Sequence, residues 1–190
     1  MNVDQMIYDT AISQGFTPTS AKLIIAQARF ESDDYKSTNF KQRNSTSGMK
    51  FVGQPKAKKS EKPSPEGDYY AVYDSVQDAI DDKIIRLYNI TRGGVTPQQL
   101  KDSKTPEDFA MLLKKRGYYG FGKYGTVEGN KEQNIYASGM KKKLLLINIK
   151  EIINNVTTTI VKNKNTTLLI VGVIFLATSF YLVKKHNINL

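Results

Sequence analysis

The sequence lacks cysteine, and its only histidine is His186, near the C-terminus. The absence of cysteine excludes disulfide bonds, thiol nucleophiles, cysteine-based zinc sites and iron–sulfur clusters. A lone histidine outside any recognisable domain excludes Ser-His-Asp triads, histidine metal sites and histidine general bases. Any catalysis must therefore use carboxylates, Tyr, Ser or Thr, Lys or Arg, and we expect neither a metal nor another cofactor.

Excess positive charge is scarce in most of the chain, although the formal net charge is +10. Residues 141–190 hold eight lysines and one acid, whereas residues 1–140 hold 20 bases and 17 acids. A nucleic-acid-binding domain concentrates positive charge on its folded body. The Gly/Tyr segment at 117–125 is not a phosphate-binding loop, because it lacks Gly-Lys followed by Ser or Thr. We therefore expect no nucleic-acid partner.

One long apolar run is present, 18 uncharged residues from Thr166 to Val183. A helix of this length is about as long as a hydrocarbon core is thick, and lysines flank both ends. The run predicts a single transmembrane helix at 166–183 and a short basic tail at 184–190; the alternative is a buried core helix. The first residues contain no apolar signal-peptide core. We therefore expect a C-terminal membrane anchor on a protein made without an export signal.

The segment before this run, residues 144–165, has apolar residues at heptad-like spacing: Leu146, Ile149, Ile153, Val156 and Ile160. This pattern predicts a helical stalk that self-associates or lies along neighbouring proteins. An amphipathic helix packed back on the domain is an equal alternative.

The body, residues 1–143, has the composition of one compact domain. Apolar spacing and capping residues predict helices over Val3–Gln14, 20–32, 75–89, 105–116 and 131–147. Residues 33–68 are polar and rich in Ser, Lys, Gly and Pro, which predicts a long loop with short strands at Lys50–Val52 and Tyr69–Tyr73. Residues 53–68 show no apolar periodicity, so we expect them to be mobile. The expected fold is mainly α, an α+β arrangement with a small irregular or β lobe.

Glu31 ends the second predicted helix, on the same face as Ile24, Gln27 and Ala28. A carboxyl group there is partly desolvated and faces the negative end of the helix dipole. Both effects favour its protonated form, which a general acid requires. An acid that ends a helix is also commonly a solvated surface residue, so the pattern alone leaves both interpretations open.

The segment that contains Glu31, IAQARFES at 25–32, resembles the AQA-x-x-ES signature of the glucosaminidases of glycoside hydrolase family 73. Lysozyme-like domains of that family cleave bacterial peptidoglycan. Further segments are similar to family motifs in the same order: NSTSGMK at 44–50, YAVYDSVQD at 70–78, LKKRGY at 113–118 and the Tyr-Ala pair at 136–137.

The resemblance implies that Glu31 is the general acid that protonates the glycosidic oxygen. It places Tyr118 beside the cleaved sugar and Tyr136 near the same groove. We expect Tyr119 and Tyr73, which lie in or next to these motifs, to bind the substrate with them. Tyrosine faces pack on sugar rings, and their hydroxyls form hydrogen bonds.

A glycosidase normally has a second carboxylate, about 5–9 Å from the first according to whether it retains or inverts. In the family this residue belongs to a mobile lobe, which corresponds here to residues 50–70. The acids of that region are Glu61, Glu66 and Asp68. We favour Glu66 or Asp68 as a catalytic residue, because they immediately precede the predicted strand at Tyr69–Tyr73.

The sequence departs from the family pattern after Glu31, where Asp33 and Asp34 replace the usual Gly and Trp. Two neighbouring acids would favour the protonated form of Glu31 by like-charge repulsion, or would replace the usual turn by a less active one. Two functions remain. One is a membrane-anchored peptidoglycan hydrolase; the other is a non-catalytic structural or adaptor protein of a viral or bacterial membrane.

An anchored body without an export signal would stay in the cytosol, away from the cell wall. A lipid-containing bacteriophage would solve this problem by carrying the protein to the next cell. The expected location is therefore a virion membrane, where the protein would act on peptidoglycan during cell entry or lysis, beside other virion proteins.

Overall fold

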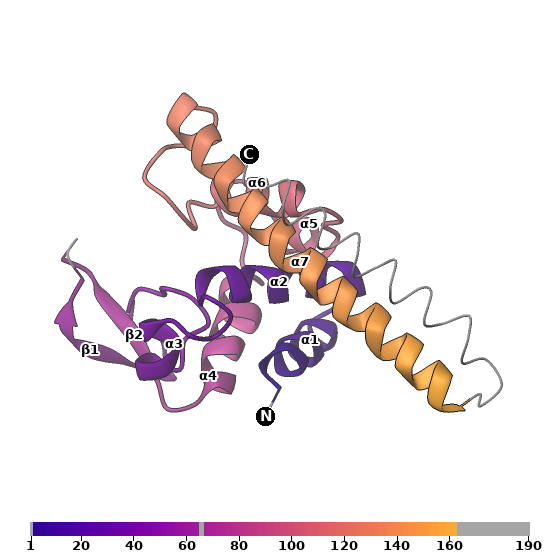
Figure 1. Ribbon diagram of the computed structural model, residues 1–190. Coiled ribbons are helices and arrows are strands. Elements are labelled where there is room, and N and C mark those ends of the chain that lie inside the picture. The colour runs from indigo at the N-terminus through magenta and orange to yellow at the C-terminus, as the bar shows by residue number, and fades with distance from the viewer. Residues whose placement is uncertain (1, 65–66, 163–190) are drawn as a thin grey trace, which may run out of the picture. The chain divides into compact units, whose positions relative to one another are not determined.

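The computed structural model describes residues 2–64 and 67–162. Its contacts divide the chain into one unit of Met1–Leu144 and a second of Leu145–Leu190. The first unit is mainly helical with one two-stranded sheet, which confirms the expected α+β class (Figure 1). In chain order the elements are α1 (Val3–Ser13), α2 (Pro18–Glu31), α3 (Thr38–Arg43), β1 (Ala57–Pro63), β2 (Tyr69–Tyr73), α4 (Val76–Asp81), the π-helix η1 (Asp82–Leu87), α5 (Pro97–Lys101), α6 (Pro106–Lys115) and α7 (Val127–Lys162).

Helix α2 lies at the centre of the core. All residues from Ser20 to Ala28 are buried except Lys22, and α1 packs along the helix. A helix that is apolar nearly all round is typical of such a central position. Its start is fixed by Thr17, whose side chain accepts a hydrogen bond from the Ser20 amide at 3.1 Å, with Pro18 at the first helical position.

Helix α7 approaches the end of α2 through a glycine. A Cβ atom at Gly139 would overlap the ring of Phe30, so only glycine allows this close packing. The Phe30 ring in turn meets the ring of Tyr136 edge-on, with centroids 5.4 Å apart. This contact brings Tyr136 of α7 to the C-terminal end of α2.

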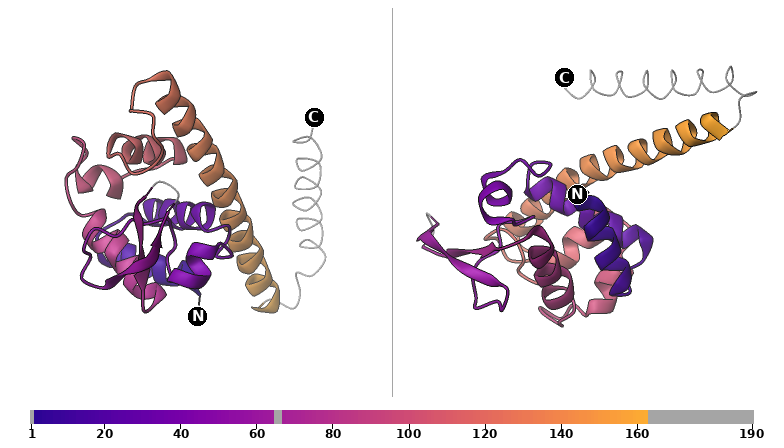
Figure 2. Two further views of the ribbon diagram at one scale, coloured as in Figure 1. Left: turned by 90° about the vertical axis from the view of Figure 1, so that its left-hand side faces the viewer. Right: turned by 90° about the horizontal axis from the view of Figure 1, so that it is seen from below.

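The β lobe is a hairpin that projects from the helical body (Figure 2). Strand β2 matches the predicted strand, but its partner β1 lies at Ala57–Pro63, where the sequence predicted an irregular segment. The predicted strand at Lys50–Val52 is reduced to an isolated bridge between Lys50 and Tyr70. Strand β1 is an edge strand of mostly exposed polar residues, so it carries no apolar alternation. Its pairing comes from β2.

The predicted helix at 75–89 is present in two parts, α4 and the π-helix η1. Its start is confirmed, because the Ser75 side chain caps it by accepting from the Asp78 amide at 3.1 Å. The Thr105 cap and Pro106 start of α6 are also confirmed. Short helices α3 and α5 were not predicted, and α7 begins four residues earlier than expected, at Val127.

The second unit is described from residue 145 to residue 162, where α7 continues. Among the residues that the structure describes, no helix is both long and apolar enough to cross a membrane. The predicted transmembrane run at 166–183 and the basic tail at 184–190 lie outside the described residues.

Candidate active site

Glu31 is the last residue of α2, and its side chain is 14% exposed. Its Oε1 atom accepts hydrogen bonds from the Tyr136 hydroxyl and, at 3.1 Å, from Nε2 of Gln27. Its Oε2 atom accepts from the Tyr118 hydroxyl at 3.4 Å. The Nζ atom of Lys83 lies 3.9 Å from Oε2. The carboxyl group is thus held at both oxygens while one part of it remains accessible.

Four segments of the chain supply these partners. Gln27 comes from α2 itself, one turn before Glu31, and Tyr136 comes from α7. Tyr118 follows α6, and Lys83 belongs to η1. Hydrogen-bond donors and a cation stabilise the ionised carboxylate, whereas burial stabilises the neutral acid. Because these effects oppose each other, the carboxyl group can both hold and release a proton.

Gln27 is a buried hub in this arrangement. Besides Glu31, its Nε2 donates to the Tyr136 hydroxyl at 2.8 Å, and its Oε1 accepts from the Tyr88 hydroxyl at 2.5 Å. Burial, reinforced by the charge of Glu31, raises the pKa of Tyr88, Tyr118 and Tyr136 well above the usual value. The three hydroxyls therefore remain protonated, and those of Tyr118 and Tyr136 remain donors to the carboxylate.

The structure also shows where the other predicted substrate-binding tyrosines lie. The Tyr119 ring stacks on Tyr136, with centroids 3.9 Å apart, and its hydroxyl donates to the carbonyl of Ala110 at 3.0 Å. Tyr73 is only 2% exposed, and its hydroxyl donates to Asp82 at 2.7 Å. The prediction that Tyr73 binds substrate is therefore corrected: its ring and hydroxyl are used inside the protein.

The two predicted second acids belong to the β lobe. Asp68 immediately precedes β2, is partly exposed and forms an ion pair with Lys50. Glu66 lies outside the described residues. The contacts of the described residues thus join Glu31 to Tyr118 and Tyr136, and through ring stacking to Tyr119, while Asp68 is held on the hairpin.

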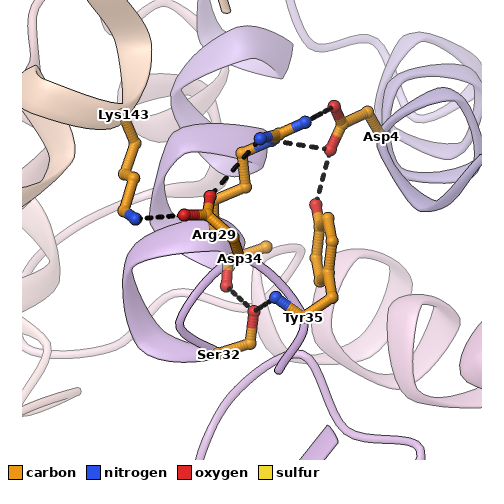
Figure 3. A network of polar contacts seen from close by, with 7 residues as sticks. Asp4, Arg29, Ser32, Asp34, Tyr35 and Lys143 are labelled. Carbon is orange, nitrogen blue, oxygen red and sulfur yellow. Dashed lines mark hydrogen bonds and ion pairs between the residues drawn. The ribbon is translucent and has the colours of Figure 1, made fainter. Parts of the chain in front are cut away.

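The chain leaves α2 through an unusual left-handed turn. Asp33, Asp34 and Tyr35 have φ values of 50°, 51° and 66°, a region that disfavours residues other than glycine. Figure 3 shows the contacts that hold this turn. The Tyr35 hydroxyl donates to Asp4 at 2.6 Å, the Tyr35 amide donates to Ser32 Oγ at 3.0 Å, and Asp34 accepts from Lys143 Nζ at 2.5 Å.

Arg29 joins the two halves of this network. Its guanidinium donates to both carboxylate oxygens of Asp4, at 2.6 to 3.2 Å, and to Asp34 at 3.3 Å. Burial raises the pKa of Asp34, but the hydrogen bond from Lys143 and the charges of Lys143 and Arg29 outweigh it, so the net shift is downward. The acid predicted to repel the charge of Glu31 is therefore neutralised by two cations.

The Gly/Tyr loop after α6 is pinned by a buried ion pair. The ammonium of Lys114 pairs with Glu132 of α7 and donates to the Tyr119 carbonyl at 3.1 Å. Glu132 also accepts from the amides of Phe121 and Gly122, at 3.1 Å each. The hydrogen bond from Lys114 lowers the pKa of Glu132. These bonds fix the segment that carries Tyr118 and Tyr119.

Sequence reasoning missed Lys83, Tyr88 and the hub role of Gln27. The spacing of Gln27 and Glu31, four residues apart on one helix, was visible. Lys83 falls on the apolar face of its helical segment with Ile80 and Ile84, which could have marked it as buried. Nothing in the local sequence links Tyr88 to α2, because that contact is formed only by the tertiary fold.

A helical domain with a β hairpin and an accessible carboxyl group at the end of its central helix defines a lysozyme-like glycoside hydrolase. The chain belongs to the glucosaminidase family, because the family model described as mannosyl-glycoprotein endo-beta-N-acetylglucosaminidase matches residues 13–166. The resemblance to glycoside hydrolase family 73 is thereby confirmed, and the chain is a glycoside hydrolase.

Solved structures share the fold. The glycoside hydrolase domain of Salmonella typhimurium FlgJ is 19% identical, with a TM-score of 0.54 over 86% of this chain and 99% of that one. The catalytic domain of the autolysin Auto from Listeria monocytogenes is 20% identical, with a TM-score of 0.48 over 78% of this chain and 82% of that one. No curated protein sequence matches the chain significantly.

Proposed function

We propose that this glycoside hydrolase cleaves the glycan strands of bacterial peptidoglycan, with Glu31 as its general acid. The observation that carries the proposal is the setting of Glu31. Its carboxyl group ends the central helix, is 14% exposed, and is held by partners from α2, α7, η1 and the loop after α6. Such a group can be presented to a glycosidic oxygen in a fixed orientation.

In the proposed reaction, the Glu31 carboxyl group gives its proton to the glycosidic oxygen as the bond to the anomeric carbon breaks. Gln27 and Tyr136 keep Oε1 in place, so that the proton is carried on the Oε2 side. Tyr118 and Tyr119 would contact the sugar beside the cleaved bond. Phe121, 85% exposed on the same loop, offers a further apolar face for the glycan.

The products of peptidoglycan digestion test this function. The full-length protein is incubated with purified peptidoglycan, and the released fragments are reduced and identified by mass spectrometry. Reducing-end N-acetylglucosamine is the expected product of a glucosaminidase, whereas reducing-end N-acetylmuramic acid would identify a muramidase. No release of glycan fragments would contradict the proposal and favour the non-catalytic adaptor function.

The second carboxylate is proposed to be Glu66 or Asp68, on the hairpin side of the domain. Changing each singly, Glu66→Gln and Asp68→Asn, should identify it, because loss of the catalytic partner lowers the cleavage rate by about 100-fold or more. The other variant should retain near-wild-type activity. Glu61→Gln, which removes an exposed acid of the same hairpin, is the control. Full activity in both Glu66→Gln and Asp68→Asn would exclude both residues.

We propose that residues 166–183 anchor the protein in a membrane. The support is the sequence itself: 18 uncharged residues between lysines, long enough to cross a hydrocarbon core. The full-length protein should sediment with membranes through a carbonate wash and require detergent for release. A variant ending at Asn165 should remain in the supernatant and still digest peptidoglycan. Detergent-free solubility of the full-length protein would contradict the anchor.

The anchored hydrolase is further proposed to belong to a virion. A membrane-bound wall hydrolase carried by a lipid-containing bacteriophage would meet peptidoglycan as each new cell is entered. The stalk, residues 144–165, would then self-associate or contact other virion proteins. Detection of the protein in purified, protease-washed particles checks this proposal, and its confinement to membranes of cells without viral genes would contradict it.

A further inference from the structure

Lys83 is the one site residue whose burial has no evident structural benefit. Its side chain is 2% exposed, and among the described residues its Nζ atom has no hydrogen-bond partner. An ammonium group removed from water without hydrogen bonds destabilises a fold. Burial accordingly lowers the pKa of Lys83, while the charge of Glu31 opposes that shift. A lysine retained at such a cost indicates a role other than stability.

The local geometry directs this ammonium group at Glu31. The Nζ atom lies 3.9 Å from Glu31 Oε2, too far for a hydrogen bond but close enough for a strong charge interaction. It lies 5.7 Å from the centre of the Tyr118 ring. Lys83 belongs to the π-helix η1, and π-helical turns occur frequently at functional sites. Its neighbour Asp82 is used elsewhere, by Arg86 and Tyr73.

We propose that Lys83 is a positioning residue that stabilises the carboxylate which Glu31 becomes when it donates its proton. The inference rests on the proposed role of Glu31 as general acid. In that step the proton moves to the glycosidic oxygen, the bond from that oxygen to the anomeric carbon breaks, and the negative charge stays on Glu31. Lys83 loses no proton. The new charge forms beside a pre-placed cation in a site shielded from water, where attraction is stronger than in bulk solvent.

The charge of Lys83 should also set the upper pH limit of the reaction. A nearby cation makes Glu31 give up its proton more readily, so activity falls at a lower pH than it would without the cation. The other titratable groups that face this site from packed elements are neutral donors: Tyr88 after η1, Tyr118 after α6 and Tyr136 of α7. Lys83 is therefore the cation that faces Glu31 among the described groups of the site.

The test compares Lys83→Met, which keeps the volume and removes the charge, with Lys83→Arg, which keeps the charge. In the full-length protein, Lys83→Met should lower the maximal rate of peptidoglycan cleavage by about 10- to 100-fold. It should also move the alkaline limb of the pH–rate profile up by about one unit. Its Tm should be unchanged or higher, because a buried unpaired charge is removed. Lys83→Arg should keep the wild-type alkaline limb.

Lys141→Met is the matched control, because it removes an exposed lysine that pairs with Glu107 on the surface. An unchanged pH–rate profile in Lys83→Met, or a lower Tm with no change in that profile, would overturn the proposal. Glu31→Gln separates this failure from failure of the proposed function. If Glu31→Gln is inactive while Lys83→Met keeps the wild-type profile, Glu31 is the acid and only the role of Lys83 is wrong. If Glu31→Gln is active, the acid itself is misassigned.

Discussion

Glu31→Gln should lower the rate of peptidoglycan cleavage by about 1,000-fold, because the amide cannot donate a proton to the glycosidic oxygen. The change is nearly isosteric, and the Gln carbonyl oxygen can keep the bonds from Tyr136 and Gln27. The Tyr118 hydroxyl can rotate to accept from the new amide group. The free energy of unfolding should therefore change by no more than about 1–2 kcal/mol. Dye release from labelled cell walls and urea denaturation measure the two quantities.

The control for this variant is Glu128→Gln, which removes an exposed acid in the first turn of α7. It should leave the cleavage rate unchanged. Residual activity of Glu31→Gln above a few per cent of wild type would mean that another group supplies the proton. A large loss of stability would instead show that the carboxylate is mainly a structural partner of the buried tyrosines.

The helices that begin with strong local signals could be predicted from the sequence. Ser75 and Thr105 each accept the capping hydrogen bond that their spacing to Asp78 and Asp108 indicated. Strand β1 could not be predicted, because its Lys, Ser and Glu side chains have no apolar alternation. It exists through pairing with β2, and its one buried contact, from the Tyr70 amide to Ser60 Oγ, joins the two strands of the hairpin.

The site shows the same division between local and tertiary information. Glu31 could be located because helix periodicity and a motif converge on one residue. Tyr118 and Tyr136 could be named from the family motifs, but their hydrogen bonds to Glu31 depend on how α7 and the loop after α6 pack against α2. The position of Lys83 depends on a π-helical turn inside an ordinary-looking helix. Tyr73 was misassigned because a motif position does not reveal burial.

Arg29→Met should destabilise the protein by about 2–3 kcal/mol, because it leaves the partly buried carboxylates of Asp4 and Asp34 with fewer partners. Methionine keeps much of the side-chain volume, so the effect reports mainly on charge and hydrogen bonds. Urea denaturation at neutral pH measures it. Arg92→Met is the control, because this exposed arginine belongs to no ion pair among the contacts of the described residues, and its loss should change stability by less than about 0.5 kcal/mol.

The pH dependence of this loss identifies its cause. The pKa of Asp34 is lower in the folded protein than its ordinary value of 3.8, so its contribution is fully present above that value. It disappears as the pH falls through the lowered pKa and the carboxylate becomes protonated. The difference in stability between wild type and Arg29→Met should therefore be constant from about pH 5 to 7 and shrink below about pH 4. A difference that is unchanged at low pH would show that packing, not charge, is responsible.

The same variant tests whether the network positions the catalytic acid. Three consecutive left-handed residues follow Glu31 by one residue, and each such residue costs about 1–2 kcal/mol when its contacts are lost. Without Arg29, the turn is held by Tyr35 on Asp4 and Lys143 on Asp34 alone. We expect the end of α2 to loosen and the rate of peptidoglycan cleavage to fall by about 10-fold or more under conditions where the variant is still folded. Full activity in a folded but destabilised Arg29→Met would restrict the network to a role in stability, and Glu31 would then be positioned by Gln27, Tyr118 and Tyr136 alone.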